Sequence, residues 1–267
     1  MPKLKTMAQG MKDAEVSVTG RLLGVLGAFE GSSKPLSIKQ ISEKTGIPLS
    51  SAYRFVGDLE AWGALTKLKD GRYQVGMRIW ELGQHAGVQQ REHVIRPFLQ
   101  DLFDVAHENV HMAVRQGANA LYVDKIYGTK KLPTVSRIGS RLPLHATAVG
   151  RVLLAAEPTW FVNAYLDKTL SAPTTKTVLS REALDRELRQ VKRQGYSITV
   201  EQMRIGASSI AVPVVVSGEC IASVGIVLES SRGDELLALL PYLKGTVEGI
   251  QRALTPAAKG RVTIPLR

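Results

Sequence analysis

One pentapeptide in this sequence has the spacing of a zinc hydrolase. His107, Glu108 and His111 form the pattern HExxH, in which two imidazoles on one helical face bind Zn²⁺ and the glutamate acts as general base. The apolar alternation over residues 110–114 instead predicts that a strand has begun before His111. No HxxGxxH extension follows, and no acidic residue that could supply a third ligand occurs over residues 125–156. We therefore interpret the pentapeptide as a helix-to-strand junction and keep a zinc hydrolase only as the alternative function.

A second group of polar side chains has the types and spacing to contact duplex DNA. Four apolar residues recur at helical intervals and predict the buried stripe of a short helix: Ala52, Phe55, Val56 and Leu59. The other side of this helix carries two hydroxyls, a phenol and a guanidinium, which belong to Ser50, Ser51, Tyr53 and Arg54. Hydroxyls and helix N–H groups can hold phosphates, and Arg54 can reach a guanine edge. This face is the predicted reader of DNA sequence.

A shorter helix and a glycine turn must position that reader. Ser37 is a favoured N-cap, and Gln40 three residues later completes a capping box. Gly46 can adopt the left-handed conformation that ends a helix, and Pro48 suits the entry to the next one. The two helices and their turn predict a helix-turn-helix, and we include Ser37 among the expected DNA contacts.

A basic hairpin follows the predicted reader. Residues 65–69 and 72–75 alternate in polarity around Asp70-Gly71, a strong hairpin turn. Three cations lie near its tip and are expected to hold the flanking phosphates: Lys67, Lys69 and Arg72. A reader followed by such a hairpin is a winged helix-turn-helix. The competing interpretation is a protein-interaction module with solvated lysines, but the cap, the turn, the apolar stripe and the hairpin together favour DNA binding.

Composition narrows the class of protein. The 267 residues are 44% hydrophobic and 22% charged, which is typical of a globular protein with more than one domain. The net charge of +11 favours a polyanionic partner, although the excess is spread over both halves of the chain. The single cysteine, Cys220, excludes an internal disulfide framework. Without an apolar run of membrane-spanning length or a signal peptide, the protein is expected to be cytoplasmic.

Changes in pattern along the chain predict five segments. They are a disordered arm over residues 1–16, the winged helix-turn-helix over 17–76, a linker helix over 77–90, a second domain over 91–256 and a tail over 257–267. The second domain alternates amphipathic helices with strands, several of them paired as hairpins, and we place one further strand at residues 133–137. The predicted fold class is therefore α+β, with a C-terminal domain built on an antiparallel sheet.

Three stretches, taken in order, match a known pattern. They are ISEKTGIPLSSAYRFVGDLEAWGAL with GRYQVGMRIWELG, then RIGSRLPLHATAVGRVLLA, then GYSITVEQMRIGASSIAVPV. Together they resemble the IclR family of bacterial transcription regulators, over residues 18–254. The resemblance implies a winged helix-turn-helix, a linker helix and a GAF-like α/β effector-binding domain, assembled as a homodimer or homotetramer. It also implies that a small metabolite, often an organic acid, controls binding to operator DNA.

Physical chemistry favours an anionic effector in the second half. A helix predicted over residues 147–156 would offer its N-terminal N–H groups and dipole to a carboxylate. Nearby His145 is more simply explained as a packed histidine. By motif position, the resemblance implies an effector pocket formed by these residues: Ala148, Val149, Thr199, Ser209, Gly225 and Val227, with Lys131 on a further wall.

The working prediction is a regulator that needs no cofactor or metal. Each dimer would present two readers to a pseudo-palindromic site in double-stranded operator DNA, with half-sites about one helical turn, or multiples, apart. Membrane binding is not expected. The alternative is an enzyme built on the GAF-like domain, or the zinc hydrolase considered above.

Overall fold

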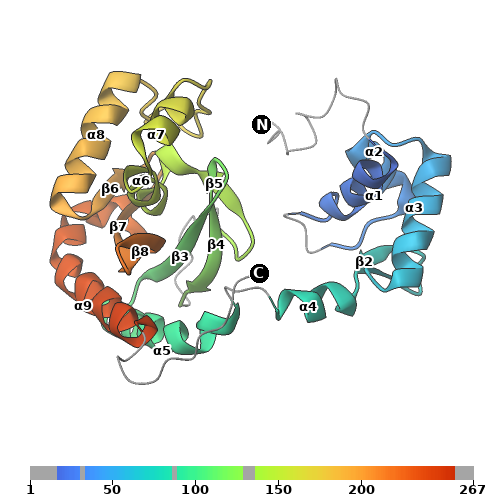
Figure 1. Cartoon of the computed structure of the whole chain (residues 1–267), viewed down its shortest axis with the longest axis horizontal. Helices are drawn as coiled ribbons and strands as arrows, with labels where there is room; N and C mark the ends of the chain where they lie inside the picture. The colour runs from blue at the N-terminus through green and yellow to red at the C-terminus, as the bar shows by residue number, and fades with distance from the viewer. Residues whose placement is uncertain (1–16, 31–33, 86–88, 129–135, 256–267) are drawn as a thin grey trace. The chain divides into compact units, whose positions relative to one another are not determined.

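The computed structural model describes residues 17–30, 34–85, 89–128 and 136–255 (Figure 1). The chain divides into two compact units, Met1–Gln90 and Arg91–Arg267. The predicted arm over residues 1–16 and the predicted tail over 257–267 lie outside the described residues. Among the described helices, none combines the length and hydrophobicity needed to cross a bilayer.

The first unit is a small helical domain with a two-stranded hairpin. Its elements are α1 (Val18–Gly27), α2 (Ile38–Thr45), α3 (Leu49–Trp62), β1 (Leu65–Lys67), β2 (Tyr73–Val75) and α4 (Met77–Gly83). The predicted apolar stripe of α3 is buried against residues of α1 and α2, including Val25 and Ile41. Strands β1 and β2 pair antiparallel, and Tyr73 also bridges to Leu36. The winged helix-turn-helix is confirmed.

Local signals in the sequence set the limits of α2. The Ser37 hydroxyl accepts from the backbone N–H of Gln40, and the Gln40 side chain accepts from the N–H of Ser37, so the predicted capping box is confirmed. Gly46 ends the helix at φ +72°, a conformation that glycine adopts without a Cβ clash.

The end of α3 is joined closely to the start of α4. Gly76 donates its N–H to the carbonyl of Ala64, and a Cβ at Gly76 would lie 2.2 Å from the carbonyl oxygen of Gly63. Arg78 on α4 donates to the carbonyl of Trp62 at 3.1 Å, and its guanidinium lies 4.4 Å from the Trp62 ring centroid. A cation over an aromatic face is attractive, so these contacts hold the two helices together.

The second unit contains a six-stranded antiparallel sheet in the order β5-β4-β3-β8-β7-β6. Its strands are β3 (Asn109–Gln116), β4 (Asn119–Ile126), β5 (Arg141–Pro143), β6 (Ser197–Val200), β7 (Ala207–Val216) and β8 (Glu219–Glu229). Its helices are α5 (Gln89–Ala106), α6 (Ala148–Ala155), α7 (Thr159–Leu166), α8 (Arg181–Gln194) and α9 (Leu236–Leu254), with short 3-10 turns η2 (Leu144–Ala146) and η3 (Ser230–Glu235).

Helices cover both faces of this sheet (Figure 1). On one face, apolar residues of α5 and α9 pack on Val110, Val212 and Ile226. On the other face, α6, α7 and α8 pack on Ala113 and Ala211. The α+β fold with an antiparallel sheet is therefore confirmed.

The sequence misplaced one strand and missed one helix of the second unit. The strand predicted at 133–137 is wrong in its described part, because Ser136 and Arg137 lie in a loop and the strand begins at Arg141. A turn at Gly139, with φ +83°, separates that loop from the strand. Helix α7 was not predicted. The linker helix was predicted over residues 77–90. Helix α4 ends at Gly83, α5 begins at Gln89, and residues 86–88 lie outside the described part. The boundaries proposed for the linker therefore stay a prediction.

Candidate DNA-binding surface and effector site

The polar side of α3 faces solvent. Tyr53 is 60% exposed, and Ser50 and Arg54 are also exposed, whereas Ser51 is half-buried. Ser37 is half-buried at the start of α2, where its oxygen already accepts the capping hydrogen bond. Gly57 lies on the exposed side of α3, and a Cβ there would meet no atom of the chain within 4 Å. The first unit therefore leaves this face of the helix open to a partner.

The three cations of the hairpin differ in whether they are paired with an acidic residue. Lys67 and Lys69 are exposed, with the Lys67 ammonium 6.0 Å from the Tyr73 ring centroid. Arg72 is paired with Asp70, because its Nε donates to the Asp70 carboxylate at 2.7 Å. This contact also lowers the pKa of Asp70. Arg72 must exchange or share its carboxylate partner before it can hold a phosphate.

A cavity of about 50 Å³ lies in the second unit, on the face of the sheet that α6 covers. Thr199, Ser209 and Val227 lie in one row across β6, β7 and β8, because Thr199 pairs with Ser209 and Ser209 pairs with Val227. All three line the cavity. The Thr199 and Ser209 hydroxyls are hydrogen-bonded to each other at 2.8 Å. Three of the seven predicted pocket residues therefore line one cavity.

The other predicted pocket residues do not line this cavity. Ala148 and Val149, the first two residues of α6, are buried in the core. A Cβ at Gly225 would lie 2.9 Å from Val149 Cγ1 and 2.9 Å from the Ile210 carbonyl oxygen. A side chain at Gly225 would therefore meet both α6 and the neighbouring strand β7, and the place of Gly225 in the effector pocket stays a prediction. Lys131 lies outside the described residues.

Several lining residues were not predicted. They are His111, Tyr122, Ser136, Leu142, Thr147, Met203, Arg204 and Ala207. The only available signal was strand alternation, which puts His111 on the face opposite Val110 and Met112. Arg204 lies in the β6–β7 loop and is the only Lys or Arg among the described lining residues.

The inner wall of the cavity is uncharged at neutral pH. Burial and the nearby Lys125 ammonium lower the pKa of His111 to about 3. Its Nε2 lies 3.2 Å from the Ser136 hydroxyl, and its ring packs edge-on against Tyr122. Burial also raises the pKa of Tyr122, although a hydrogen bond with Thr147 opposes this rise. The wall therefore offers neutral hydrogen-bonding groups beside the cation of Arg204.

The HExxH residues do not form a zinc site. Helix α5 ends at Ala106, His107 has a left-handed backbone at φ +52°, and β3 begins at Asn109. Glu108 forms an ion pair with Arg232. The junction interpretation is confirmed, and within the described ranges no group of three or more His, Cys, Asp or Glu residues could hold a metal ion.

His145 and Cys220 also have packing roles. His145 is buried, with Nδ1 2.8 Å from the Tyr165 hydroxyl and Nε2 2.9 Å from the carbonyl oxygen of Ser171. Burial lowers the pKa of His145 and raises that of Cys220 to about 11, so the thiol stays protonated at neutral pH.

Comparison with known proteins assigns the family. The family described as "IclR helix-turn-helix domain" matches residues 18–69, and "Bacterial transcriptional regulator IclR C-terminal" matches residues 87–252. The chain belongs to the IclR family. It is accordingly a DNA-binding transcriptional regulator controlled by a small-molecule effector, as its motifs predicted.

Individual IclR-family proteins resemble the chain over most of its length. The HTH-type transcriptional regulator XynR of Escherichia coli (strain K12) is 32% identical over 201 residues, which cover 73% of this chain and 78% of XynR. The Pca regulon regulatory protein of Pseudomonas putida is 33% identical over 212 residues, which cover 77% of this chain and 72% of that protein. An IclR homolog from Microbacterium hydrocarbonoxydans, solved in complex with 4-hydroxybenzoate, has a TM-score of 0.84 at 26% identity. That match covers 89% of this chain and 99% of the homolog.

Proposed function

We propose that this IclR-family regulator binds a pseudo-palindromic operator by inserting α3 into the major groove. The observation that carries this proposal is the separation of the two sides of α3, with the apolar stripe buried and Tyr53 and Arg54 exposed. Ser50 and Ser51 at the start of the helix would hold phosphates, as would Ser37 at the start of α2. The hairpin would add phosphate contacts through Lys67, Lys69 and Arg72.

The operator-binding form is proposed to be a homodimer or a dimer of dimers. Helix α4 exposes large apolar side chains, with Met77 65%, Trp80 59% and Leu82 53% exposed. Met77 and Trp80, three residues apart, share one face of α4, and a second copy of the same helix would cover this apolar face. Two-fold symmetry would then present two α3 helices to two half-sites.

The proposed effector is a small organic acid that enters the cavity beside Thr199 and Ser209. Arg204 would attract its carboxylate, and the hydroxyls of the wall would accept or donate hydrogen bonds. Leu142, Met203 and Val227 would contact an apolar body. The homolog that binds 4-hydroxybenzoate makes hydroxylated aromatic acids the first class to examine. We propose Lys131 as a second cation for the effector. Three further residues would support the pocket wall from behind: Ala148, Val149 and Gly225.

The effector would act by changing the relative placement of the two readers through the linker. A coupling of about 1–3 kcal/mol between effector and operator would give a useful switch. The proposal assigns no catalytic step to the protein and no role to a metal or cofactor.

The experiment measures binding of the full-length protein to DNA from its own upstream region. Affinity should fall steeply with added salt, because each neutralised phosphate releases counterions. Weak binding that does not distinguish this DNA from random sequence would refute the proposal.

The effector site is tested by Ser209→Phe, which fills the cavity, with Ser209→Ala as the control that leaves it open. Ser209→Phe should retain operator affinity and lose the response to 4-hydroxybenzoate or related acids. If Ser209→Phe responds as wild type does, Ser209 is not part of the effector site.

A further inference from the structure

The β6–β7 loop, residues 201–206, forms part of the wall of the effector cavity through Met203 and Arg204. Its ends are closed by its own hydrogen bonds, since the Glu201 carboxylate accepts from Gly206 N–H at 2.7 Å and Glu201 N–H donates to Ala207 at 2.9 Å. Those bonds close the loop but do not fix where its tip lies. The position of the tip needs contacts with other elements.

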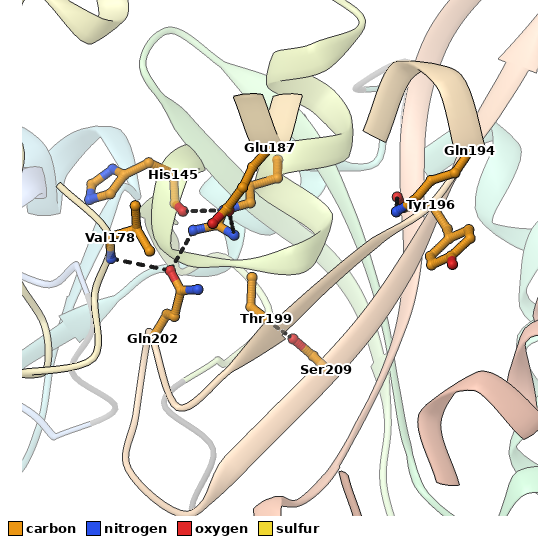
Figure 2. A network of polar contacts seen from close by, with 9 residues as sticks. His145, Val178, Glu187, Gln194, Tyr196, Thr199, Gln202 and Ser209 are labelled. Carbon is orange, nitrogen blue, oxygen red and sulfur yellow. Dashed lines mark hydrogen bonds and ion pairs between the residues drawn. The ribbon is translucent and has the colours of Figure 1, made fainter. Parts of the chain in front are cut away.

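Gln202 makes those contacts, as Figure 2 shows. Its side-chain oxygen accepts from Arg151 and from the backbone N–H of Val178, the latter at 3.3 Å. Its main-chain carbonyl accepts from the Thr177 hydroxyl at 2.7 Å and from the Thr174 hydroxyl at 3.4 Å, and Thr174 also donates to the Glu201 carbonyl at 2.7 Å. The residue that precedes Met203 is therefore held through both its side chain and its backbone.

Arg151 is the donor that links this loop to the core. Its side chain is 2% exposed, although α6 is otherwise an apolar helix. Its Nε donates to the carbonyl of His145 at 2.7 Å, one terminal nitrogen pairs with Glu187 on α8, and the other donates to Gln202. A planar guanidinium can make all three bonds in a fixed geometry, which an ammonium cannot.

The contact between Arg151 and Gln202 lies between two cavities. On one side is the effector cavity, lined by the next two residues of the loop. On the other side is a second cavity of about 310 Å³, lined by Arg151, Gln202 and residues of α8 and β6. Because of this space, side-chain packing on that side does not hold Gln202 in place. Gln202 is instead held in place by its hydrogen bonds.

We propose that Arg151, acting through Gln202, is the positioning residue that holds Met203 and Arg204 against the effector. The argument rests on the effector site proposed above and adds to it a determinant that does not touch the ligand. The buried guanidinium fixes the loop through the Gln202 side chain, and loss of this acceptor leaves the loop tied only through its backbone carbonyls, which loosens the tip. Effector affinity then falls while operator affinity stays unchanged.

The test replaces the acceptor and keeps the arginine. Gln202→Met preserves side-chain length but cannot accept from Arg151 or Val178. Gln190→Met is the matched control, because Gln190 lines the same second cavity from α8 and its side chain donates to Gln194 on the same helix, not to the loop. Gln202→Glu is the rescue variant, since a carboxylate still accepts from the guanidinium.

Amide hydrogen exchange of the ligand-free, full-length protein is the first measurement. In Gln202→Met, exchange at Gly206 and Ala207, whose N–H groups bond within the loop, should accelerate by about tenfold or more, as expected for loss of a charge-assisted hydrogen bond. Peptides from α9 should exchange as in wild type, which excludes general destabilisation. Wild-type exchange at Gly206 and Ala207 in Gln202→Met, or equal acceleration in Gln190→Met, would overturn the proposal.

Binding of 4-hydroxybenzoate, followed by calorimetry, is the second measurement. Gln202→Met should weaken it by about tenfold, with Gln202→Glu close to wild type. If wild type binds neither this probe nor related acids, the proposed effector class fails, but the exchange result still decides the positioning role. If the loop is released and affinity for a bound acid is unchanged, the positioning role is wrong and the effector site stands.

Discussion

His111 makes the stability of the protein depend on pH in a way that one substitution should remove. The imidazole is buried, and its pKa falls from 6.5 to about 3 because burial and the Lys125 charge disfavour the imidazolium. An unfolded chain takes up a proton at this residue near pH 6.5, whereas the folded protein does not. Stability therefore rises with pH in this range, since the unfolded state binds more protons.

The size of the effect follows from the two pKa values. Above about pH 6.5 both states are neutral and the residue contributes no pH dependence. Below it, each pH unit costs about 1.4 kcal/mol until the folded pKa is reached. Lowering the pH from about 7.5 to about 5 should thus reduce the free energy of unfolding by about 2 kcal/mol through His111 alone.

The assay is urea denaturation of wild type and His111→Gln at both pH values. A glutamine amide can replace Nε2 as the partner of the Ser136 hydroxyl, but it does not titrate. The variant should lose about 2 kcal/mol less on acidification than wild type does. His93→Gln, at an exposed position on α5, is the control. Its free energy of unfolding should fall on acidification by as much as that of wild type. Equal losses in wild type and His111→Gln would refute the assignment of a buried, neutral His111.

Two further predictions concern the reader and the sheet. Arg54→Ala should weaken operator binding by roughly 1–3 kcal/mol and relax specificity at one base pair, measured by competition with single-base operator variants; a uniform loss on operator and random DNA would mean that Arg54 holds only phosphate. Gly225→Ala should destabilise the protein by about 1–3 kcal/mol in thermal or urea unfolding, because the added methyl meets the Ile210 carbonyl and Val149; unchanged stability would contradict the close packing of α6 on the sheet.

Features that depend on neighbouring residues were predictable from the sequence. The capping box joins residues three apart, the left-handed Gly46 needs only its own lack of a Cβ, and the α3 stripe repeats with the helical period. The helix-to-strand junction at HExxH was also predictable, because the apolar alternation of a strand begins before His111. Each of these signals lies within a few residues of the feature it specifies.

The cavity proposed to bind the effector depends on pairing between distant segments, which one sequence does not reveal. The family resemblance, not a local pattern, predicted three of the lining residues: Thr199, Ser209 and Val227. They lie side by side only because β6, β7 and β8 pair in this register. His111 reaches the same cavity because β3 pairs with β8, a neighbour far along the chain. For Gly225, the motif alone could not distinguish a place in the pocket wall from close contact with α6, and the structure shows the close contact.

The junction between α3 and α4 has a consequence for how control reaches DNA. Gly76 leaves no room for a side chain against Gly63, and Arg78 bonds to Trp62 at the end of the recognition helix. These contacts couple the two helices, so a rotation imposed on α4 is expected to move α3 with it. In the proposed dimer, regulation would need no refolding inside the DNA-binding unit, and its specificity for bases would be preserved while the spacing between two such units changes.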